Sequence, residues 1–272
     1  SYGKESFTNI ADISAITSTK GDTVLNAKDS IYLIGSNINS NKNIALLANN
    51  NILSKTVKDK GSYDFSMSGG YYKRDYEYSL GSNLNAKENL LLKANKDITL
   101  ISSNLNSNKD TILNSGNNIN VLSSLESDYS ETKSTSKGFM SKKTELTKSL
   151  EQNVKSSNIN GENIYINANN DINLQSVNLI ADQNSNKKDL NDNINNSKNG
   201  NKGTISIVSN NGNINIASAS YTTYYDTQTD KSSFGGLSKS SSKLNDTTIS
   251  QSSSNLFSAN SINLKANNIN VI

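Results

Sequence analysis

The residue types that carry covalent and acid–base chemistry are scarce in this sequence of 272 residues. It contains no cysteine and no histidine, which excludes the usual zinc sites, disulfides, thiol nucleophiles and Ser-His-Asp triads. Carboxylates are present, but the regular parts of the chain carry no acid pair at the spacing that glycoside hydrolysis needs. The sequence therefore predicts no catalytic residue, no metal site and no cofactor.

The remaining candidates are aromatic and cationic side chains, which bind ligands without reacting with them. Nine of the twelve tyrosines fall in three short segments, and tyrosine offers a large apolar face with a polar tip. Lys73 and Arg74 lie beside Tyr71 and Tyr72, a combination that suits an anionic headgroup. The candidate binding residues are Tyr63, Phe65, Tyr71, Tyr72, Lys73, Arg74, Tyr76, Tyr78, Tyr221, Tyr224, Tyr225 and Phe234.

A purely structural role is the alternative for the same residues. The tyrosines could cover the flank of their own scaffold, or pair across strands to hold a hairpin together. Asp75 and Glu77 could balance the charges of Lys73 and Arg74 at a solvated tip. The sequence leaves both interpretations open.

The overall composition narrows the choice of partners. There are 27 basic and 24 acidic residues, so a nucleic-acid partner is not expected. No run of 18 apolar residues is present that could span a membrane. The first residues lack the charged start and apolar run of a signal peptide, so an exported chain is expected to be an excerpt of a longer precursor.

The sequence repeats itself at an interval of about 21 residues. Ser82-Asn83-Leu84-Asn85 returns at 103–106, and Ile98-Thr99-Leu100 returns as Ile119-Asn120-Val121. In each unit apolar and polar residues alternate over four or five positions, which is typical of a short strand with one buried face. Strands this short cannot form a core alone, but coils that carry three of them can stack. We therefore predict an all-β fold, a right-handed parallel β-helix (β-solenoid) with about 21 residues per rung and roughly seven rungs.

The unusual composition agrees with such a coil. The chain has 48 asparagines, 46 serines and no proline. Asparagine tolerates the backbone of tight turns, and repeats in register can stack asparagine over asparagine in hydrogen-bonded ladders. Proline is unsuitable because every rung needs its backbone N–H groups to bond the next rung.

Four inserts interrupt the repeats, at about 55–79, 125–155, 184–202 and 220–253. The first, second and last contain aromatic residues and alternating stretches, with Gly-Gly pairs in two of them, which favours β-hairpins projecting from the coil. For Met140–Asn153 a short helix is an alternative, because Leu146 and Leu150 are four residues apart. The insert at 184–202 is nearly all Asn, Lys, Ser and Asp and is predicted to be a flexible loop.

Several of these segments resemble a known family. The run Ser136–Thr144, followed by Ser156–Ile164 and Ala168–Ile172, is similar to the haemagglutinin repeat of bacterial filamentous haemagglutinins and contact-dependent growth-inhibition exoproteins. Tyr221–Leu237, which ends in Ser-Ser-Phe-Gly-Gly-Leu, resembles the next copy of the same insert. The resemblance covers nearly the whole chain, in the order coil, insert, coil. The chain departs from the common pattern in having Asn where relatives have Gly and Thr, and in lacking a His after the Lys-Lys-Thr run.

The resemblance implies a non-catalytic structural segment of a secreted filament on the outer surface of a Gram-negative bacterium. It implies export through an outer-membrane transporter of the two-partner secretion type. It also implies contact with a target-cell surface, through its outer membrane, a glycan or a receptor protein, for adhesion or for delivery of a C-terminal toxin to neighbouring cells. Residues 1–272 would then form a single solenoid segment of a longer protein, uncapped and flanked by further repeats of the same chain.

Three other functions stay open. An adhesin that binds host cells or glycans without a toxin would use the same tyrosine-rich hairpins. A membrane-active cytolysin built on the same secretion system would insert its Tyr, Phe and Gly hairpins at an interface. A polysaccharide-degrading β-helix enzyme is the least favoured, since clustered carboxylates are missing from the predicted rungs.

Overall fold

The computed structural model describes residues 2–10, 13–182 and 203–272. Most of these residues lie in β-strands, and the one helical element among them is the 3₁₀ turn η1 (Phe234–Gly236). No helix in the described part is long and apolar enough to cross a membrane. The loop predicted at 184–202 lies outside the described residues.

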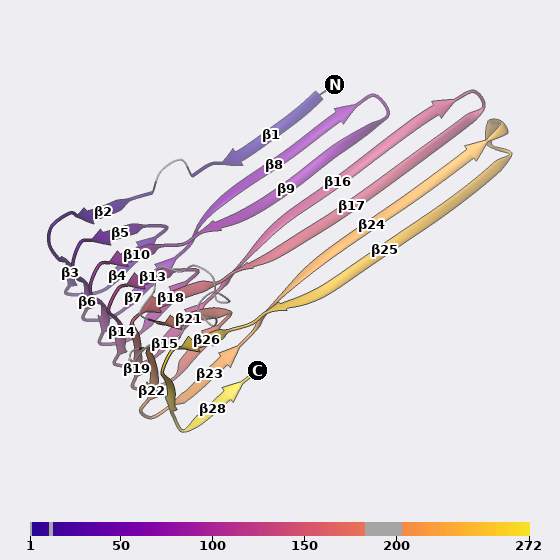
Figure 1. Cartoon of the computed structure of the whole chain (residues 1–272). Coiled ribbons are helices and arrows are strands. Elements are labelled where there is room, and N and C mark those ends of the chain that lie inside the picture. Colours follow the sequence, from indigo (N-terminus) through magenta and orange to yellow (C-terminus); the bar gives the residue numbers. More distant parts are fainter. Residues whose placement is uncertain (1, 11–12, 183–202) are drawn as a thin grey trace.

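Three seven-stranded parallel sheets form the coil, and a seven-stranded antiparallel sheet extends from it (Figure 1). Coil sheet 1 consists of β2 (Ala15–Ser18), β5 (Asn37–Ser40), β10 (Asn83–Ala86), β13 (Asn104–Ser107), β18 (Ser157–Gly161), β21 (Val177–Ala181) and β26 (Asn255–Ser258). Coil sheet 2 consists of β3 (Thr23–Ala27), β6 (Ile44–Ala48), β11 (Leu90–Ala94), β14 (Asp110–Ser115), β19 (Asn163–Ala168), β22 (Thr204–Ser209) and β27 (Ser261–Lys265). Coil sheet 3 consists of β4 (Ile31–Ile34), β7 (Ile52–Lys55), β12 (Ile98–Ile101), β15 (Ile119–Leu122), β20 (Ile172–Gln175), β23 (Asn213–Ala217) and β28 (Asn268–Val271).

Each rung supplies one strand to each of the three coil sheets. Asn83 pairs with Asn104, and Ile98 with Ile119, so these stacked residues are 21 positions apart. Seven strands in each sheet give seven rungs in the described part of the chain. The predicted parallel β-solenoid, with about 21 residues per rung and projecting hairpins, is confirmed.

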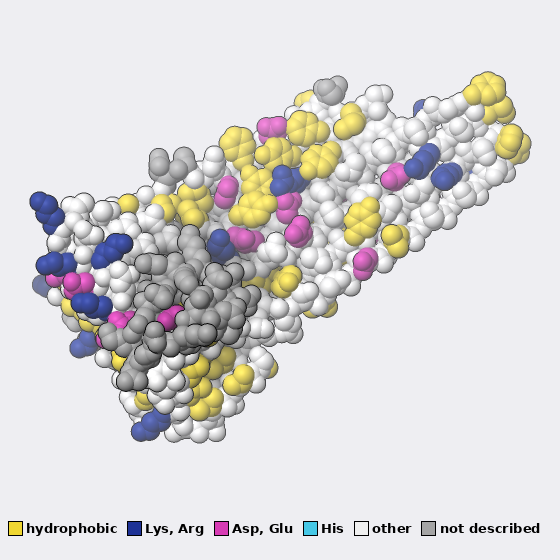
Figure 2. Space-filling model, in the orientation of Figure 1, with side chains coloured by type: hydrophobic (Ala, Val, Ile, Leu, Met, Phe, Trp, Pro, Cys, Tyr) yellow, Lys and Arg dark blue, Asp and Glu magenta, His cyan; other side chains and the backbone are white. Residues whose placement is uncertain are grey.

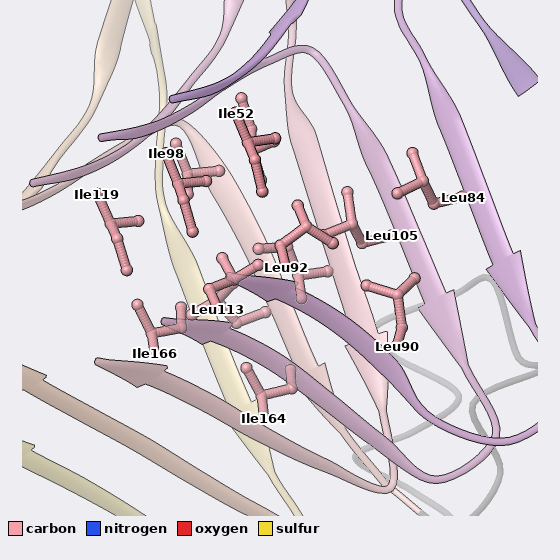
Figure 3. Packing of buried hydrophobic residues seen from close by; sticks show 14 of the residues in the cluster. Ile52, Leu84, Leu90, Leu92, Ile98, Leu105, Leu113, Ile119, Ile164 and Ile166 are labelled. Atoms are coloured by element: carbon pink, nitrogen blue, oxygen red, sulfur yellow. The ribbon is translucent and has the colours of Figure 1, made fainter. Parts of the chain in front are cut away.

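A narrow apolar channel enclosed by the coil sheets is the core. Every second side chain of a strand points into it, so that Leu90, Leu92 and Ala94 of β11 are buried. Because the rungs are in register, each inward position forms a column, such as Ile52, Ile98 and Ile119 in coil sheet 3. Figure 3 shows these isoleucines together with leucines of the other two coil sheets. Each buried side chain therefore packs against equivalent residues of the rungs before and after it.

Asparagine ladders run along the outer faces of the coil. In coil sheet 1 the amide of Asn83 donates to Oδ1 of Asn37 at 2.8 Å, and that of Asn104 donates to Asn83 at 2.7 Å. The ladder continues in the same direction through Asn158, Asn178 and Asn255 and so joins six rungs. Coil sheet 3 has a comparable ladder. The ladders predicted from the composition are present.

Three β-hairpins leave the coil after its second, fourth and sixth rungs. They are β8 (Val57–Met67) with β9 (Gly70–Leu80), β16 (Ser124–Gly138) with β17 (Ser141–Lys155), and β24 (Ala219–Ser233) with β25 (Ser238–Ser252). With β1 (Tyr2–Thr8) at one edge, they pair into one continuous sheet in the order β1-β8-β9-β16-β17-β24-β25, which we call the hairpin sheet. Neighbouring strands lie about 4.8 Å apart, so the two strands of a hairpin span the same axial distance as two rungs. An insert at every second rung therefore builds a sheet without gaps.

The short helix considered for Met140–Asn153 is wrong. Ser141–Lys155 form strand β17, which pairs antiparallel with β16 on one side and with β24 on the other. Residues four apart also share one face of a strand, so the spacing of Leu146 and Leu150 does not distinguish the two structures. Two neighbouring strands offer partners for the backbone groups of the whole segment, and this long-range pairing decides the conformation.

Where the second and third hairpins leave the coil, a serine hydroxyl bonds the two ends of the interrupted coil to each other. The hydroxyl of Ser157, after the second hairpin, donates to the carbonyl of Leu122 at 2.7 Å and accepts the backbone N–H of Ser103 at 3.0 Å. Ser254, after the third hairpin, donates to the carbonyl of Ala217 at 2.8 Å. In each case the serine bonds to the residue that ends the coil strand before the hairpin. The Ser of the Ser-Asn-apolar repeat thus spans the gap where the chain leaves the coil.

Candidate functional site

Strand alternation divides the candidate binding residues between the two faces of the hairpin sheet. Directly paired residues share a face, and the register pairs Tyr63 with Arg74, Phe65 with Tyr72, and Tyr76 with Asp128. We call this side the aromatic face, and its candidates are Tyr63, Phe65, Tyr72, Arg74, Tyr76, Tyr78, Tyr221 and Tyr225. The opposite side, which we call the Glu131 face, carries Tyr71, Lys73 and Tyr224.

Four aromatic rings form a stacked row across β8 and β9 on the aromatic face. The ring centroids are 6.5 Å apart between Phe65 and Tyr63, 6.2 Å between Tyr63 and Tyr76, and 5.2 Å between Tyr76 and Tyr78. These separations are those of favourable offset-stacked pairs. Phe65 and Tyr78 at the ends of the row remain 36% and 38% exposed. Figure 2 shows hydrophobic side chains gathered over the β8–β9 part of the hairpin sheet, with charged side chains among them.

Two glycines make room for rings of this row. Gly61 pairs with Tyr76, and a Cβ at Gly61 would lie 2.2 Å from an atom of the Tyr76 ring. A Cβ at Gly3 of β1 would lie 2.5 Å from the ring of Phe65. Real Cβ atoms do not approach other atoms this closely, so both rings lie directly over glycines of the neighbouring strand. Such a ring also covers a backbone that glycine leaves bare.

An ion pair on the aromatic face ties the first hairpin to the second. Arg74 of β9 donates from Nε to Oδ1 of Asp128 at 2.9 Å and from Nη2 to Oδ2 at 2.5 Å, the bidentate geometry of strong arginine–carboxylate pairs. The guanidinium lies 5.1 Å from the ring centroid of Tyr76, and the hydroxyl of Tyr78 donates to Asp128 at 2.9 Å. Hydrogen bonding from Arg74 is the main reason why the pKa of Asp128 is lowered. The charge of Arg74 is therefore balanced within the sheet.

The balancing acids differ from Asp75 and Glu77, which the sequence suggested. Arg74 pairs with Asp128 of the next hairpin, and Lys73 lies 3.7 Å from Asp64 of β8. Glu77 instead pairs with Lys58 at 2.9 Å and with Lys60 at 2.6 Å. These ion pairs join residues of neighbouring strands, and the linear sequence does not show which strands are neighbours.

Glu131 of β16 organises the opposite face. Tyr71 and Tyr129 both donate to its carboxylate, Tyr129 at 2.7 Å, and Nζ of Lys148 lies 3.6 Å away. The bond from Tyr71 is the main cause of the lowered pKa of Glu131, and the same bond raises the pKa of Tyr71. Lys73 lies over the ring of Tyr71, 5.5 Å from its centroid. On this face the hydroxyl of Tyr71 joins the first hairpin to the second, whereas that of Tyr129 bonds within β16.

Sequence reasoning missed Asp128, Tyr129 and Glu131 as partners of the tyrosine cluster. Asp128 is 54 residues from Arg74, and Glu131 is 60 residues from Tyr71. The usable signal was the two-residue alternation of charged and aromatic residues in both inserts. Turning that signal into contacts needs the register between the two hairpins, which the inserts alone do not specify.

The remaining candidates lie apart from the ring row. Tyr225 is exposed on the aromatic face, opposite Ser149, whereas Tyr224 pairs with Leu150 on the Glu131 face. Tyr221 lies near the root of β24, and Phe234 lies in η1 at the tip of the third hairpin. The structure therefore brings together the candidates of the first insert and leaves those of the last insert dispersed.

This arrangement offers non-covalent binding. Among the residues that the structure describes, no cluster of three or more His, Cys, Asp or Glu side chains could hold a metal ion. A shallow hollow of about 480 Å³ crosses β1, β8, β9 and β16 and is lined by Lys60, Glu77 and Tyr129 among others. This hollow lies on the Glu131 face, and the ring row lies on the aromatic face. Both faces of the hairpin sheet therefore present aromatic groups beside charged ones.

Comparison with known proteins supports the family resemblance. Residues 63–146 match the family model described as hemagglutinin repeat. The matched segment begins within β8 and ends within β17, so it contains part of two hairpins and the two complete rungs between them. The searches of curated proteins and of solved structures gave no match. Residues 63–146, about a third of the chain, thus match the haemagglutinin repeat that the sequence resembles.

Proposed function

We propose that this chain is a non-catalytic structural segment of a secreted filament on the bacterial cell surface, in which the hairpin sheet is the binding surface. The observation that carries the proposal is the hemagglutinin repeat at residues 63–146. Its limits enclose the ring row from Tyr63 onward and the Arg74–Asp128 pair that joins two hairpins. The repeat thus contains both the coil and the surface that projects from it.

The fold supports a filament because its repeating unit can be added without a change of geometry. Two rungs advance the coil by about 9.6 Å, and two hairpin strands advance the hairpin sheet by about the same distance. One unit therefore extends both structures equally. Solenoids of this kind are stabilised by contacts between neighbouring repeats. A longer solenoid therefore needs no wider core.

In this proposal the chain is exported through an outer-membrane transporter of the two-partner secretion type, and flanking repeats of the same protein continue the filament. The filament serves adhesion to a target-cell surface or delivery of a C-terminal toxin in contact-dependent inhibition. Exposed aromatic rings support the contact step, because rigid rings bind glycans and proteins with little loss of conformational entropy.

A matched pair of variants tests the contact step. Phe65→Ser with Tyr72→Ser removes two aromatic side chains that pair with each other on the aromatic face. Tyr32→Ser with Tyr165→Ser removes two exposed aromatic side chains from the coil and is the control. Binding of the purified proteins to candidate target cells and to a glycan array is measured after circular dichroism has shown that each variant folds.

We expect the aromatic-face variant to lose about tenfold in affinity, as interface aromatic residues commonly contribute at least this much. The coil variant should bind like the wild type. Equal binding by all three proteins would reject the aromatic face as the contact surface.

A further inference from the structure

Large apolar side chains are exposed at the tips of the second and third hairpins. Phe139 is 96% exposed and Leu237 is 92% exposed, with Met140 and Phe234 next to them. Because β17 pairs with β24 as far as Ser141 with Ser233, the two tips lie side by side. Figure 2 shows hydrophobic side chains at the end of the hairpin sheet farthest from the coil. Fully exposed side chains of this size mark a site of interaction when they cluster.

These tips extend beyond the rest of the hairpin sheet. The strands β16, β17, β24 and β25 have 15 residues each, whereas β8 and β9 have 11. Four extra residues per strand correspond to about 13 Å. The second and third tips would therefore reach a flat surface before the first hairpin does.

Lysines lie immediately behind the apolar tips. The outer parts of the two hairpins, residues 133–146 and 228–243, contain seven lysines and two acids, a net charge of +5. The whole chain has a net charge of +3, so the remainder is −2. The molecule is thus electrically asymmetric, with its positive charge concentrated toward the tips.

Two hollows, one on each face of the hairpin sheet, are lined by four of these lysines and by several serine hydroxyls. The larger, of about 570 Å³ on the Glu131 face, is lined by Lys142, Lys239 and Asp230 among others, and the smaller, of about 380 Å³ on the aromatic face, by Lys143 and Lys231 among others. Lys143 forms an ion pair with Glu145 at 2.6 Å. The other three lysines form no ion pair with the described residues, so their charges are available to a ligand.

We propose that the tips of the second and third hairpins dock on an anionic lipid membrane. Phe139, Met140, Phe234 and Leu237 enter the boundary between headgroups and acyl chains, and the lysines behind them bind headgroup phosphates. The apolar tips lie outermost and the lysines lie behind them, which matches the positions of hydrocarbon and phosphate in a bilayer. Interfacial segments insert about 5–10 Å into a bilayer. Clustered lysines next to inserted apolar groups favour anionic lipid. This inference goes beyond the proposed function, since contact through the aromatic face needs no lipid.

Co-sedimentation with lipid vesicles tests the docking. The probes are vesicles of phosphatidylcholine alone and of phosphatidylcholine mixed with phosphatidylglycerol. We expect the wild-type chain to bind the mixed vesicles at least about tenfold more tightly than the neutral ones, and to lose this binding at high salt. Failure of the wild type to bind the mixed vesicles would overturn the proposal.

Paired variants separate the tips from the rest of the hairpin sheet. Phe139→Ser with Leu237→Ser removes the most exposed tip residues, and Phe7→Ser with Ile249→Ser removes exposed apolar residues nearer the coil. For the charges, Lys142→Gln, Lys231→Gln and Lys239→Gln are combined, with Lys20→Gln, Lys28→Gln and Lys42→Gln on the coil as the control of equal charge change. Only the two tip variants should lose about tenfold or more in vesicle affinity. Equal losses in tip and control variants would contradict docking through the tips.

A fluorescence reporter measures insertion directly, because the chain contains no tryptophan. Phe139→Trp should show a blue-shifted emission and quenching by bromine-labelled acyl chains when mixed vesicles are added. Phe7→Trp, near the coil, should show neither. An unchanged Phe139→Trp spectrum on bound vesicles would overturn insertion. The aromatic-face variant Phe65→Ser with Tyr72→Ser should still insert, so failure of this inference is distinguishable from failure of the proposed function.

Discussion

Arg74 and Asp128 are 54 residues apart in the sequence, yet two hydrogen bonds join them across the boundary between the first and second hairpins. Between them in the sequence lie two complete rungs of the coil. The pair therefore links two inserts that leave the coil at different levels. The pair adds to the backbone pairing of β9 with β16, and the pairing of β17 with β24 completes one sheet from the three hairpins.

Breaking this pair should loosen the boundary between the hairpins. Asp128→Asn replaces the carboxylate whose two oxygens accept the hydrogen bonds of Arg74. We expect a loss of about 1 kcal/mol in the free energy of unfolding, since the pair is partly exposed. Asp64→Asn, which disturbs the longer and more exposed pair with Lys73 at 3.7 Å, should cost less than about 0.5 kcal/mol. Denaturant unfolding and amide hydrogen exchange of β9 and β16 provide the measurement. Equal losses for both variants would show that the bidentate geometry is unimportant.

A side chain at Gly61 should displace the ring of Tyr76. The Cβ of Gly61→Ala would lie 2.2 Å from that ring, and we expect a destabilisation of about 1–3 kcal/mol from overpacking. Gly21→Ala is the control, because a Cβ there has its nearest neighbour at 3.8 Å. Adding Tyr76→Ser to Gly61→Ala removes the clash. If the ring causes the cost, the double variant is less destabilised than the sum of the two single variants, as thermal unfolding can show.

The sequence was sufficient to predict the coil because the same local pattern recurs on every rung. Ile98 and Ile119 are inward residues at equivalent positions, and both their alternation and their 21-residue spacing can be read without a structure. The hairpins followed from interruptions of that spacing. Their strand character at Ser141–Lys155 could not be decided from Leu146 and Leu150 alone, since residues four apart share a face in a helix and in a strand.

The contacts within the candidate site could not be predicted in the same way. The partner of Arg74 depends on how far the second hairpin is shifted relative to the first, and this register is set by where each hairpin leaves the coil. A shift of one residue would turn Asp128 to the opposite face of the sheet. The sequence thus identified the aromatic cluster, while its ion pairs required three-dimensional register.

Acid should weaken the hairpin sheet through its bonded carboxylates. Hydrogen bonds from Tyr71 first, and then from Tyr129, lower the pKa of Glu131 from its ordinary value of 4.5, and Arg74 lowers that of Asp128 from 3.8. A lowered pKa in the folded state contributes stability that is present above the ordinary pKa and is lost as the pH falls through the folded value. We therefore expect the unfolding midpoint to be constant just above pH 4.5 and to decrease below it.

Tyr71→Phe isolates the part due to Glu131. Without the phenol the pKa of Glu131 should rise toward 4.5, which carbon-detected NMR titration of the carboxyl group can follow. Tyr32→Phe, on the coil, should leave that pKa unchanged. A Glu131 titration that is identical in Tyr71→Phe and the wild type would contradict the assignment of the main cause to Tyr71.

Removing one inward side chain should destabilise neighbouring rungs together. Leu105 is fully buried and is stacked between Leu84 and Ile159 of the adjacent rungs. Leu105→Ala should reduce the free energy of unfolding by about 2–5 kcal/mol through lost burial and a residual cavity. Val24→Ala, at a position that is 58% exposed, should cost less than about 1 kcal/mol. A small effect of Leu105→Ala would mean that the coil can close around the cavity.

The asparagine ladder of coil sheet 1 has a direction that can be tested with one residue. The amide of Asn104 donates to Asn83, and Oδ1 of Asn104 accepts from Asn158. Asn104→Asp keeps an acceptor for Asn158 but turns the donor toward Asn83 into a second acceptor, so one bond is lost and two oxygens face each other. Asn104→Ala loses both bonds, and each such bond contributes about 0.5–1.5 kcal/mol.

The ladder predicts that Asn104→Asp, compared with a control aspartate variant, is less stable at neutral pH than at a pH below the pKa of the new carboxyl group, because the protonated acid can again donate to Asn83. Asn108→Asp is the control, since Asn108 is exposed and outside the ladder. The difference in unfolding free energy between the two aspartate variants, measured at pH values on both sides of about 4, gives the result. If that difference does not change with pH, the amide of Asn104 does not donate to Asn83. The asparagines of the ladder would then not donate toward the preceding rung.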